Sequence, residues 1–379
     1  MELERVYGFD EVAILPGRET CDPDDTDTSV QIGDMKIDVP ILISAMDGVV
    51  DVNMAKAMSK LGGIAVLNLE GIYTRYEDTT KVLEDIIGAS DAEFTPLMQK
   101  IYQEPIKEEL IAKRIQQMKE DGGKAVVSAT PQKADWLGRI AYEAGADAIV
   151  VQATVITIKH KSKSYKPFDL KKFVNDVKIP VIAGNCVTYD VAKDLMETGV
   201  DAILVGVGPG AACTTRGVLG IGLPQVTATM NAARARDDFY KETGKYVNII
   251  TDGGMTTGGD ICKAIASGAD MVMLGNAFAR AKESPGKGYH WGMALPHPYL
   301  PRGTRIHVGI TGSLEEITVG PAKTEDGTQN LVGAIKLSMS YCGAQTISEF
   351  HEKVQLVIAP EIKTEGKIYQ KAQRVGMGK

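Results

Sequence analysis

Three segments of this chain repeat one local pattern. Each contains the end of a helix, a glycine, a small residue, an aspartate and an apolar run: EAGADAIVV (143–151), ETGVDAILV (197–205) and ASGADMVML (266–274). Glycine after the last helical turn is a common helix stop. A short, continuous apolar run is typical of a strand that is buried on both faces. A helix, a short turn and a buried strand in repetition therefore indicate a parallel α/β fold.

Eight apolar runs of this kind occur along the chain, and helical stretches such as 52–61, 190–198 and 259–266 lie between most of them. Eight parallel strands that alternate with helices fit a (β/α)8 TIM barrel, and a doubly wound sheet is the alternative. We expect the barrel, with residues 1–379 as one catalytic domain. The predicted strands are 41–44, 64–67, 125–128, 148–151, 181–183, 202–205, 248–251 and 271–274.

Two stretches are too long to be simple connections of such a barrel. Residues 71–123 are charged and helix-prone, which predicts a helical excursion. Residues 287–330 are rich in glycine and proline and have no helical period. A long irregular segment after the last strand is typical of a functional lid, so we interpret it as a catalytic flap region. The aspartate-rich stretch 22–28 is predicted to be a solvated loop and not a metal site.

Composition and charge argue against several classes of protein. A net charge of −7 with five scattered histidines argues against nucleic acid as the main partner. No apolar run approaches the ~18 residues that span a bilayer, and the N-terminus lacks a secretory pattern, so we expect a cytoplasmic protein without membrane contact. The five cysteines have no CxxC spacing, which favours reduced thiols over disulfides or zinc.

In a TIM barrel the active site lies at the carboxyl ends of the strands. Most of the predicted strands are followed there by glycine, a small polar residue or a single acid. Turns alone favour glycine, asparagine and aspartate, but they account poorly for a glycine-dense loop that ends in a cysteine. The segments that follow the strands are 44–47, 68, 152–154, 184–185, 206–216, 252–254 and 275–276.

The loop after the sixth strand is the strongest candidate for chemistry. Its glycines let the backbone approach a ligand or ion closely. GVGPG lacks the third glycine of a dinucleotide fingerprint, and no acid follows before residue 236, so a Rossmann site is rejected. Cys213 lies beside Thr215 and Arg216. A neighbouring cation favours the thiolate form of a cysteine, which is the form that acts as a nucleophile.

A phosphate site is predicted after the last two strands. Asp252-Gly253-Gly254 and Gly275-Asn276 lie where barrels commonly bind phosphate through backbone N–H groups. The Asp252 carboxylate can accept hydrogen bonds from sugar hydroxyls.

The cysteine loop GVGPGAACTTR (206–216), followed by GIGLPQVTA (220–228), resembles the catalytic loop of the IMP dehydrogenase and GMP reductase superfamily. The resemblance covers nearly the whole chain, and it is greatest for the IMP dehydrogenase-related branch that lacks the regulatory CBS module pair, because 71–123 replaces that insertion. The other matching segments are YGFDEVAILPG (7–17), SAMDGVVD (44–51), LGGIAVLN (61–68), IPVIAGNCVT (179–188), DGGM (252–255), GADMVMLGNAFA (268–279), HWGMA (290–294) and YCGAQTISEF (341–350).

The resemblance implies NAD-dependent oxidation of IMP to XMP. By similarity, the Cys213 thiolate attacks C2 of the purine, hydride passes to NAD, and water hydrolyses the thioimidate after the flap displaces NADH. Thr215 would position that water. The family has an Arg-Tyr pair on its flap, with the arginine as base; this sequence lacks the pair and offers Arg302 and Arg305, of which we take Arg302.

The resemblance also implies the binding residues, and a homo-oligomer, either a tetramer or an octamer. The substrate IMP would contact Ser44, Met46, Asn185, Asp252, Gly253, Gly254, Gly275, Asn276, Tyr289, His290, Gly292 and Met293. The cofactor NAD would contact Gln152, Ala153, Thr154, Gly206 and Gly208. Carbonyls of Gly208, Gly210 and Cys213 are the candidate ligands of a monovalent cation such as K+.

Several positions depart from the family pattern. Ala211 replaces a usual serine, Gln152 replaces an aspartate that meets the nicotinamide ribose, and Val308 replaces an acid or amide before Gly309. The loss of the serine at 211 and of the Arg-Tyr pair leaves open a catalytically weak nucleotide-binding barrel, although Cys213 and Thr215 argue against it. A GMP reductase is the other alternative. Such reductases carry a glutamate after the Gly-Met motif, and here no acid lies between Met293 and Glu315, which favours the dehydrogenase.

Overall fold

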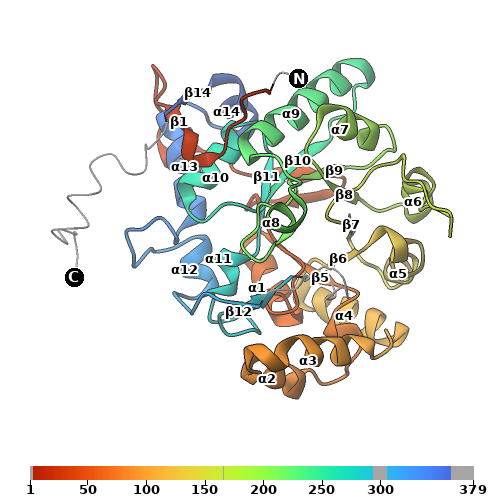
Figure 1. The fold of residues 1–379 in the computed structure, drawn as a ribbon. Coiled ribbons are helices and arrows are strands. Elements are labelled where there is room, and N and C mark those ends of the chain that lie inside the picture. Colours follow the sequence, from red (N-terminus) through yellow and green to blue (C-terminus); the bar gives the residue numbers. More distant parts are fainter. Residues whose placement is uncertain (1–2, 165, 293–304, 360–379) are drawn as a thin grey trace.

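Eight parallel strands close into a barrel at the centre of the molecule (Figure 1). The computed structural model describes residues 3–164, 166–292 and 305–359. Each strand pairs with the next along the chain, and the last, β11, pairs with the first, β4. The predicted TIM barrel is confirmed. The strands are β4 (Ile41–Ile43), β5 (Ile64–Asn68), β6 (Val126–Ala129), β7 (Ala148–Gln152), β8 (Val181–Cys186), β9 (Ala202–Val205), β10 (Asn248–Asp252) and β11 (Met271–Leu274).

The interior of the barrel is filled by alternate strand residues, such as Val66, Val150 and Leu204, which are fully buried. A hairpin of β2 (Val30–Ile32) and β3 (Met35–Ile37) adds Ile32 and Ile37 to the same cluster. The Nδ2 of Asn248, the first residue of β10, donates to the carbonyl of Gln31 in this hairpin across 2.8 Å. The hairpin therefore covers the amino end of the barrel, and the opposite end is left for the site.

The helices surround the barrel and bury the outer faces of its strands in a second, larger core (Figure 1). The three helices named from the sequence are confirmed to within two residues at each end, as α1 (Val52–Lys60), α7 (Tyr189–Met196) and α10 (Gly258–Ala266). Further helices of the ring and its C-terminal extension are α5 (Pro131–Glu143), α6 (Leu170–Val177), α9 (Gln225–Thr243), α13 (Leu331–Tyr341) and α14 (Ile347–Lys353). Strand β1 (Val12–Leu15) pairs antiparallel with β14 (Gln355–Ile358) beside this ring.

The aspartate of each repeated segment joins two neighbouring strands at their amino ends. The Oδ2 of Asp147 accepts a hydrogen bond from Ala125 N–H across 2.7 Å, and its own N–H donates to the Ala125 carbonyl across 2.8 Å. The same reciprocal pair, with side-chain distances of 3.0 and 2.7 Å, joins Asp201 with Val181 and Asp270 with Ile249. We call these three pairs the aspartate clips. They account for the aspartate in each of the three repeated segments.

The excursion 71–123 is helical, as predicted, and the structure places it along one side of the barrel (Figure 1). Helix α4 (Glu108–Lys119) packs against α1 and α5. Helix α3 (Asp91–Gln103) buries aromatic side chains that include Phe94 and Tyr102. The elements of the excursion are the 3-10 turn η3 (Ile72–Thr74), α2 (Thr80–Gly88), α3 (Asp91–Gln103), α4 (Glu108–Lys119) and the 3-10 turn η4 (Glu120–Gly122).

The segment 287–330 is more regular than its composition suggests. Strands β12 (Tyr289–Trp291) and β13 (Arg305–His307) pair antiparallel, and we call this pair the flap ribbon. Helix α12 (Leu314–Thr318) follows, with a capping box between Ser313 and Glu316. A helix of five residues is too short to produce a visible helical period.

In the stretch 22–28 the aspartates are exposed around a 3-10 turn, η2 (Pro23–Asp25), and the described residues contain no group of three or more His, Cys, Asp or Glu placed to hold a metal. None of the helices in the described ranges combines the length and the apolar composition that crossing a membrane requires.

Candidate active site at the carboxyl end of the barrel

The loop that carries Cys213 leaves β9 and is pressed onto the end of β10. Gly206 has a φ of 146° and Gly208 a φ of 72°, which favour glycine. A Cβ on Gly206 would lie 2.5 Å from the carbonyl oxygen of Asp252. The loop then enters a short helix, α8 (Thr215–Leu219). The glycines predicted from the sequence therefore allow a close approach between two strand ends.

Cys213 is exposed on this loop, whereas the other four cysteines are half-buried or buried, and all five are free. Its Sγ donates to the Oγ1 of Thr215 across 3.2 Å, and Thr215 is buried. Burial raises the pKa of the Cys186 and Cys262 thiols to about 12, so both stay protonated near neutral pH. Among these cysteines, the accessible thiol with a hydroxyl beside it is Cys213.

Arg216 fastens the cysteine loop. Its Nε donates to the carbonyl of Val207 across 3.1 Å, and its NH2 group donates to the carbonyl of Leu223 across 2.6 Å. Burial lowers the pKa of Arg216, and its interaction with Cys213 opposes that shift. The cation expected beside the thiol is present, with its hydrogen bonds directed to the backbone.

Gln225 holds the ends of β9 and β10 together and was not singled out from the sequence. It is the first residue of α9 and is buried. Its Nε2 donates to the carbonyl of Asp252 across 2.9 Å and to that of Val205 across 3.2 Å. It also lies 3.3 Å from the carbonyl of Gly253. Its position inside the matching segment GIGLPQVTA was the available signal, but nothing in the sequence indicated these partners.

Three polar side chains from β7, β8 and β10 form a closed group that we call the amide–carboxylate triangle. The Oδ2 of Asp252 accepts from Asn185 Nδ2 across 2.7 Å and from Gln152 Nε2 across 3.0 Å. Gln152 Nε2 also lies 3.3 Å from Asn185 Oδ1. Burial raises the pKa of Asp252 to about 6, and the two amide donors act in the opposite direction. The structure thus brings together one predicted cofactor residue and two predicted substrate residues.

The turn Asp252-Gly253-Gly254 lies against the cysteine loop. Both glycines have positive φ, of 80° and 81°. A Cβ on Gly254 would lie 3.1 Å from the Cβ of Pro209, and one on Gly253 would lie 3.3 Å from the backbone nitrogen of Gly210. The predicted phosphate turn and the predicted nucleophile loop are therefore direct neighbours.

The ends of β11 and β4 meet on the other side of the rim. A Cβ on Gly275 would lie 2.7 Å from the Sδ of Met46, so a side chain at this position would require the Met46 side chain to move. Ser44 is held beside it, because its N–H donates to the Leu274 carbonyl across 2.9 Å. Ser44 and Met46 are both half-buried.

Asn276 is oriented by the flap ribbon. Its Oδ1 lies 3.1 Å from the Nε2 of His290, which is buried. Burial, with a smaller effect of Arg280, lowers the pKa of His290 to about 4, so the ring is neutral near pH 7. An amide oxygen only accepts, so this hydrogen bond requires the tautomer that carries its proton on Nε2. Tyr289 stacks on His307 at 4.2 Å. The structure gives His290 the role of orienting Asn276, and a direct phosphate contact of Tyr289 or His290 stays a prediction.

Arg305, the alternative flap arginine, is an anchor of the flap ribbon. Its guanidinium donates to the carbonyls of Ile86 and Ala89, at the C-terminal end of α2, across 2.6 and 2.7 Å. It also lies over the rings of Phe94 and Tyr289, at 4.9 and 5.2 Å. Arg302 and Met293 lie outside the described residues, and Gly292 is the last residue described before them.

Local hydrogen bonds already use some of the backbone groups of the remaining cofactor and cation candidates. Both backbone groups of Ala153 are hydrogen-bonded, because its N–H donates to the Gly184 carbonyl and its own carbonyl accepts from Asn185 N–H. Thr154 is exposed. The carbonyl of Gly210 accepts from Cys213 N–H across 3.0 Å. A carbonyl has two lone pairs, so a cation on Gly208, Gly210 and Cys213 stays a prediction.

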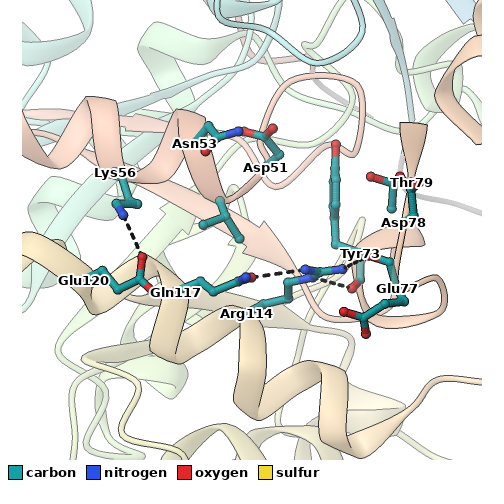
Figure 2. Close-up of a pocket in the computed structure, with 11 residues that line it drawn as sticks. Asp51, Asn53, Lys56, Tyr73, Glu77, Asp78, Thr79, Arg114, Gln117 and Glu120 are labelled. Carbon is teal, nitrogen blue, oxygen red and sulfur yellow. Dashed lines mark hydrogen bonds and ion pairs between the residues drawn. The ribbon is translucent and has the colours of Figure 1, made fainter. Parts of the chain in front are cut away.

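A separate hollow of about 280 Å³ lies at the start of α1 (Figure 2). Tyr73 lines it and donates from its hydroxyl to the carbonyl of Asp47 across 2.8 Å. Several of its charged groups are already paired, Lys56 with Glu120 and Arg114 with backbone carbonyls that include that of Tyr73. None of the predicted site residues lines it, so we assign it no role in the chemistry.

Comparison with known proteins supports the family resemblance found in the sequence. A family model described as the IMP dehydrogenase / GMP reductase domain matches residues 6–295. An uncharacterized oxidoreductase of Mycobacterium tuberculosis is 35% identical over 363 residues, which cover 93% of this chain and 96% of that protein. The inosine-5'-monophosphate dehydrogenase of Methanocaldococcus jannaschii is 26% identical, with 94% and 93% coverage. The crystal structure of an IMP dehydrogenase/GMP reductase-like protein from Corynebacterium glutamicum matches with a TM-score of 0.89 at 34% identity, covering 95% of this chain and 96% of that one.

Proposed function

Because this chain belongs to the IMP dehydrogenase / GMP reductase family, an oxidoreductase family, we propose that it oxidises IMP to XMP with NAD through a covalent bond to Cys213. The observation that carries the proposal is the exposed Cys213 thiol, 3.2 Å from the Thr215 hydroxyl, on a loop pressed against the Asp252 turn. A protein that only binds nucleotides has no need of an accessible nucleophile in that place.

The first half of the proposed reaction forms the covalent bond. The Cys213 thiol loses its proton, and the sulfur adds to C2 of the purine. C2 then loses its hydrogen with both bonding electrons, which leaves a thioimidate between Cys213 and the oxidised base. Covalent catalysis of this kind divides one difficult oxidation into two easier steps. NAD supplies the acceptor for the hydride.

The second half releases XMP by hydrolysis. Thr215 Oγ1 lies beside the sulfur and is the group that would orient the attacking water. We assign the base to Arg302, which requires surroundings that disfavour its charged form, because the ordinary pKa of arginine is above ~12. Water adds to C2, the C2–S bond breaks, and the sulfur regains a proton.

Binding of the nucleotide is assigned to the rest of the rim. Asp252 would accept hydrogen bonds from the ribose hydroxyls. Two amides already donate to its Oδ2, so Oδ1 is the oxygen left for the ribose. Gly254, Gly275 and Asn276 would bind the 5′-phosphate through backbone and amide N–H groups. The buried Oε1 of Gln152 has no partner among the described residues, which fits a donor supplied by a ligand. Thr154 would lie toward NAD.

The deciding experiment compares IMP plus NAD with GMP plus NADPH in a spectrophotometric assay of the purified protein. We expect absorbance at 340 nm to rise with the first pair and to stay level with the second. Consumption of NADPH with GMP would instead identify a GMP reductase. We also propose a homo-oligomer, a tetramer or octamer, and a sedimentation experiment that gives a monomer would contradict this.

A further inference from the structure

We propose that Gln152 is a positioning residue, which holds the Asp252 carboxylate so that its second oxygen faces the ribose of the bound nucleotide. This inference rests on the nucleotide site of the proposed function. It differs from the cofactor contact expected for this position from the sequence, because the amide nitrogen of Gln152 is directed to Asp252.

The hydrogen bonds of the amide–carboxylate triangle fix the orientation of each amide. Gln152 Nε2 faces two acceptors, Asp252 Oδ2 at 3.0 Å and Asn185 Oδ1 at 3.3 Å. Rotating this amide by 180° would place its oxygen against both of them. Asn185 is fixed in the same way, since its Nδ2 lies 2.7 Å from Asp252 Oδ2. The triangle therefore has a single favourable arrangement of donors and acceptors.

This arrangement treats the two carboxylate oxygens of Asp252 differently. Oδ2 accepts both amide hydrogen bonds, whereas Oδ1 accepts none from the described residues. With one oxygen held from two strands, the carboxylate cannot rotate freely about its χ2 bond. Oδ1 is then an acceptor held in one position at the rim. A sugar hydroxyl can donate a hydrogen bond to it.

The identity of the residue at 152 matters for the charge on Asp252. The groups that face the carboxylate from the neighbouring strands are the amides of Gln152 and Asn185, both neutral, while Gln225 bonds its backbone carbonyl. Burial already makes ionisation of Asp252 unfavourable, and the amide donors offset part of that cost. An acid at 152 would instead place a second carboxyl within hydrogen-bond distance of the first.

The test measures nucleotide binding in a Cys213→Ala background, which removes turnover. Calorimetry compares IMP with its 2′,3′-dideoxy analogue, and Gln152 with Gln152→Met, a side chain of similar length without a donor. We expect Gln152→Met to weaken IMP binding about tenfold and to leave binding of the dideoxy analogue unchanged. The loss then depends on the ribose hydroxyls, which a general structural defect would not reproduce.

A second variant, Gln152→Glu, adds a readout that depends on charge. We expect it to weaken IMP binding more at pH 8 than at pH 5.5, where one of two facing carboxyls holds a proton. Phosphate also titrates near pH 6, so the dideoxy analogue, which carries the same phosphate, is measured at both pH values. Gln355→Met, at an exposed position of β14, is the matched control and is expected to bind both ligands normally.

The outcomes separate the inference from the function on which it rests. If IMP does not bind when Gln152 is intact, both are overturned. If IMP binds equally well to the Gln152→Met protein, or if both ligands weaken by the same factor, the positioning role is overturned and the proposed function stands. Thermal unfolding of each variant shows whether a loss of binding comes from a loss of fold.

Discussion

Trp291 donates from its indole Nε1 to the hydroxyl of Tyr102 across 3.1 Å, although the two residues are far apart in the chain. The Tyr102 hydroxyl in turn donates to the buried carboxylate of Asp47, in the loop that follows β4. One hydroxyl thus connects the flap ribbon, helix α3 of the excursion and the loop that carries Met46. The excursion is therefore part of the support of the site.

Replacing this hydroxyl should destabilise the protein. Tyr102→Phe leaves the Trp291 N–H without its acceptor and Asp47 without one donor, all in a buried region. An unsatisfied buried polar group costs ~1–3 kcal/mol, so we expect a loss of about 2 kcal/mol in the free energy of unfolding, measured with urea. Tyr142→Phe, at an exposed tyrosine of α5, is the control. Equal stability of the two variants would contradict the connection.

The aspartate clips should contribute to stability without contributing to catalysis. Asp201→Ala removes the acceptor of Val181 N–H at the start of β8. A hydrogen bond to a charged group contributes ~1.5–3 kcal/mol, and we expect a loss in that range in urea unfolding with kcat unchanged. Asp34→Ala, at an exposed aspartate between β2 and β3, should change neither quantity. A fall in kcat without a loss of stability would contradict this prediction.

Cys213 should be both the essential and the most reactive thiol. Cys213→Ala should abolish NADH formation from IMP, whereas Cys21→Ala, at a half-buried cysteine, should retain it. Iodoacetamide should label Cys213 before Cys186 and Cys262, because burial raises the pKa of those two thiols to about 12. Mass spectrometry of the labelled peptides measures the order, and turnover in the alanine variant would refute the mechanism.

Arg302 should act in the hydrolytic half of the reaction. We expect Arg302→Ala to slow hydrolysis more than hydride transfer, so that rapid mixing with IMP and NAD gives a burst of NADH followed by slow release of XMP. Arg305→Lys is the comparison, because Arg305 is bonded to the end of α2 and should affect stability without producing a burst. Equal slowing of both steps would exclude Arg302 as the base.

Asp252 should be destabilising to the fold when it is ionised. Burial raises its pKa to about 6, from a value of 3.8, so the folded protein binds this proton more tightly than the unfolded chain does. Ionisation therefore costs stability above pH 6, and the cost disappears as the pH falls from 6 to 3.8. We expect Asp252→Asn to stabilise the protein by about 2–3 kcal/mol at pH 8 and by little at pH 4. Urea unfolding at both pH values, with Asp34→Asn as the control, measures this, and a destabilised variant at pH 8 would contradict it.

The strands and the position of the cysteine loop at a strand end could be predicted because their signals are local. Apolar runs such as 202–205 are continuous and are bounded by glycine, which is enough to place a buried strand. The contacts that orient the site have no such signal. Gln152 and Asp252 are a hundred residues apart, and nothing near either one indicates the other. Gln225 appeared only as one letter of a matching segment.

The flap ribbon shows the same limit on a smaller scale. Its strands have three residues each, so neither gives an alternation that the sequence could show. Arg305 looked like a candidate base because it follows Arg302 closely, and its actual partners, at the end of α2, depend on the packing of the excursion. The partners of Arg305 come from a segment that is distant in the sequence, so its neighbours in the chain could not indicate them.

The aspartate clips lie at the amino ends of the strands, and Cys213 follows a strand at its carboxyl end. The hydrogen bonds that join neighbouring strands and the candidate catalytic groups thus lie at opposite ends of the barrel strands. Sequence changes in the rim loops can alter which molecule is transformed while these pairs stay intact. Such a division leaves a protein of this architecture free to acquire a different chemistry without rebuilding what keeps it folded.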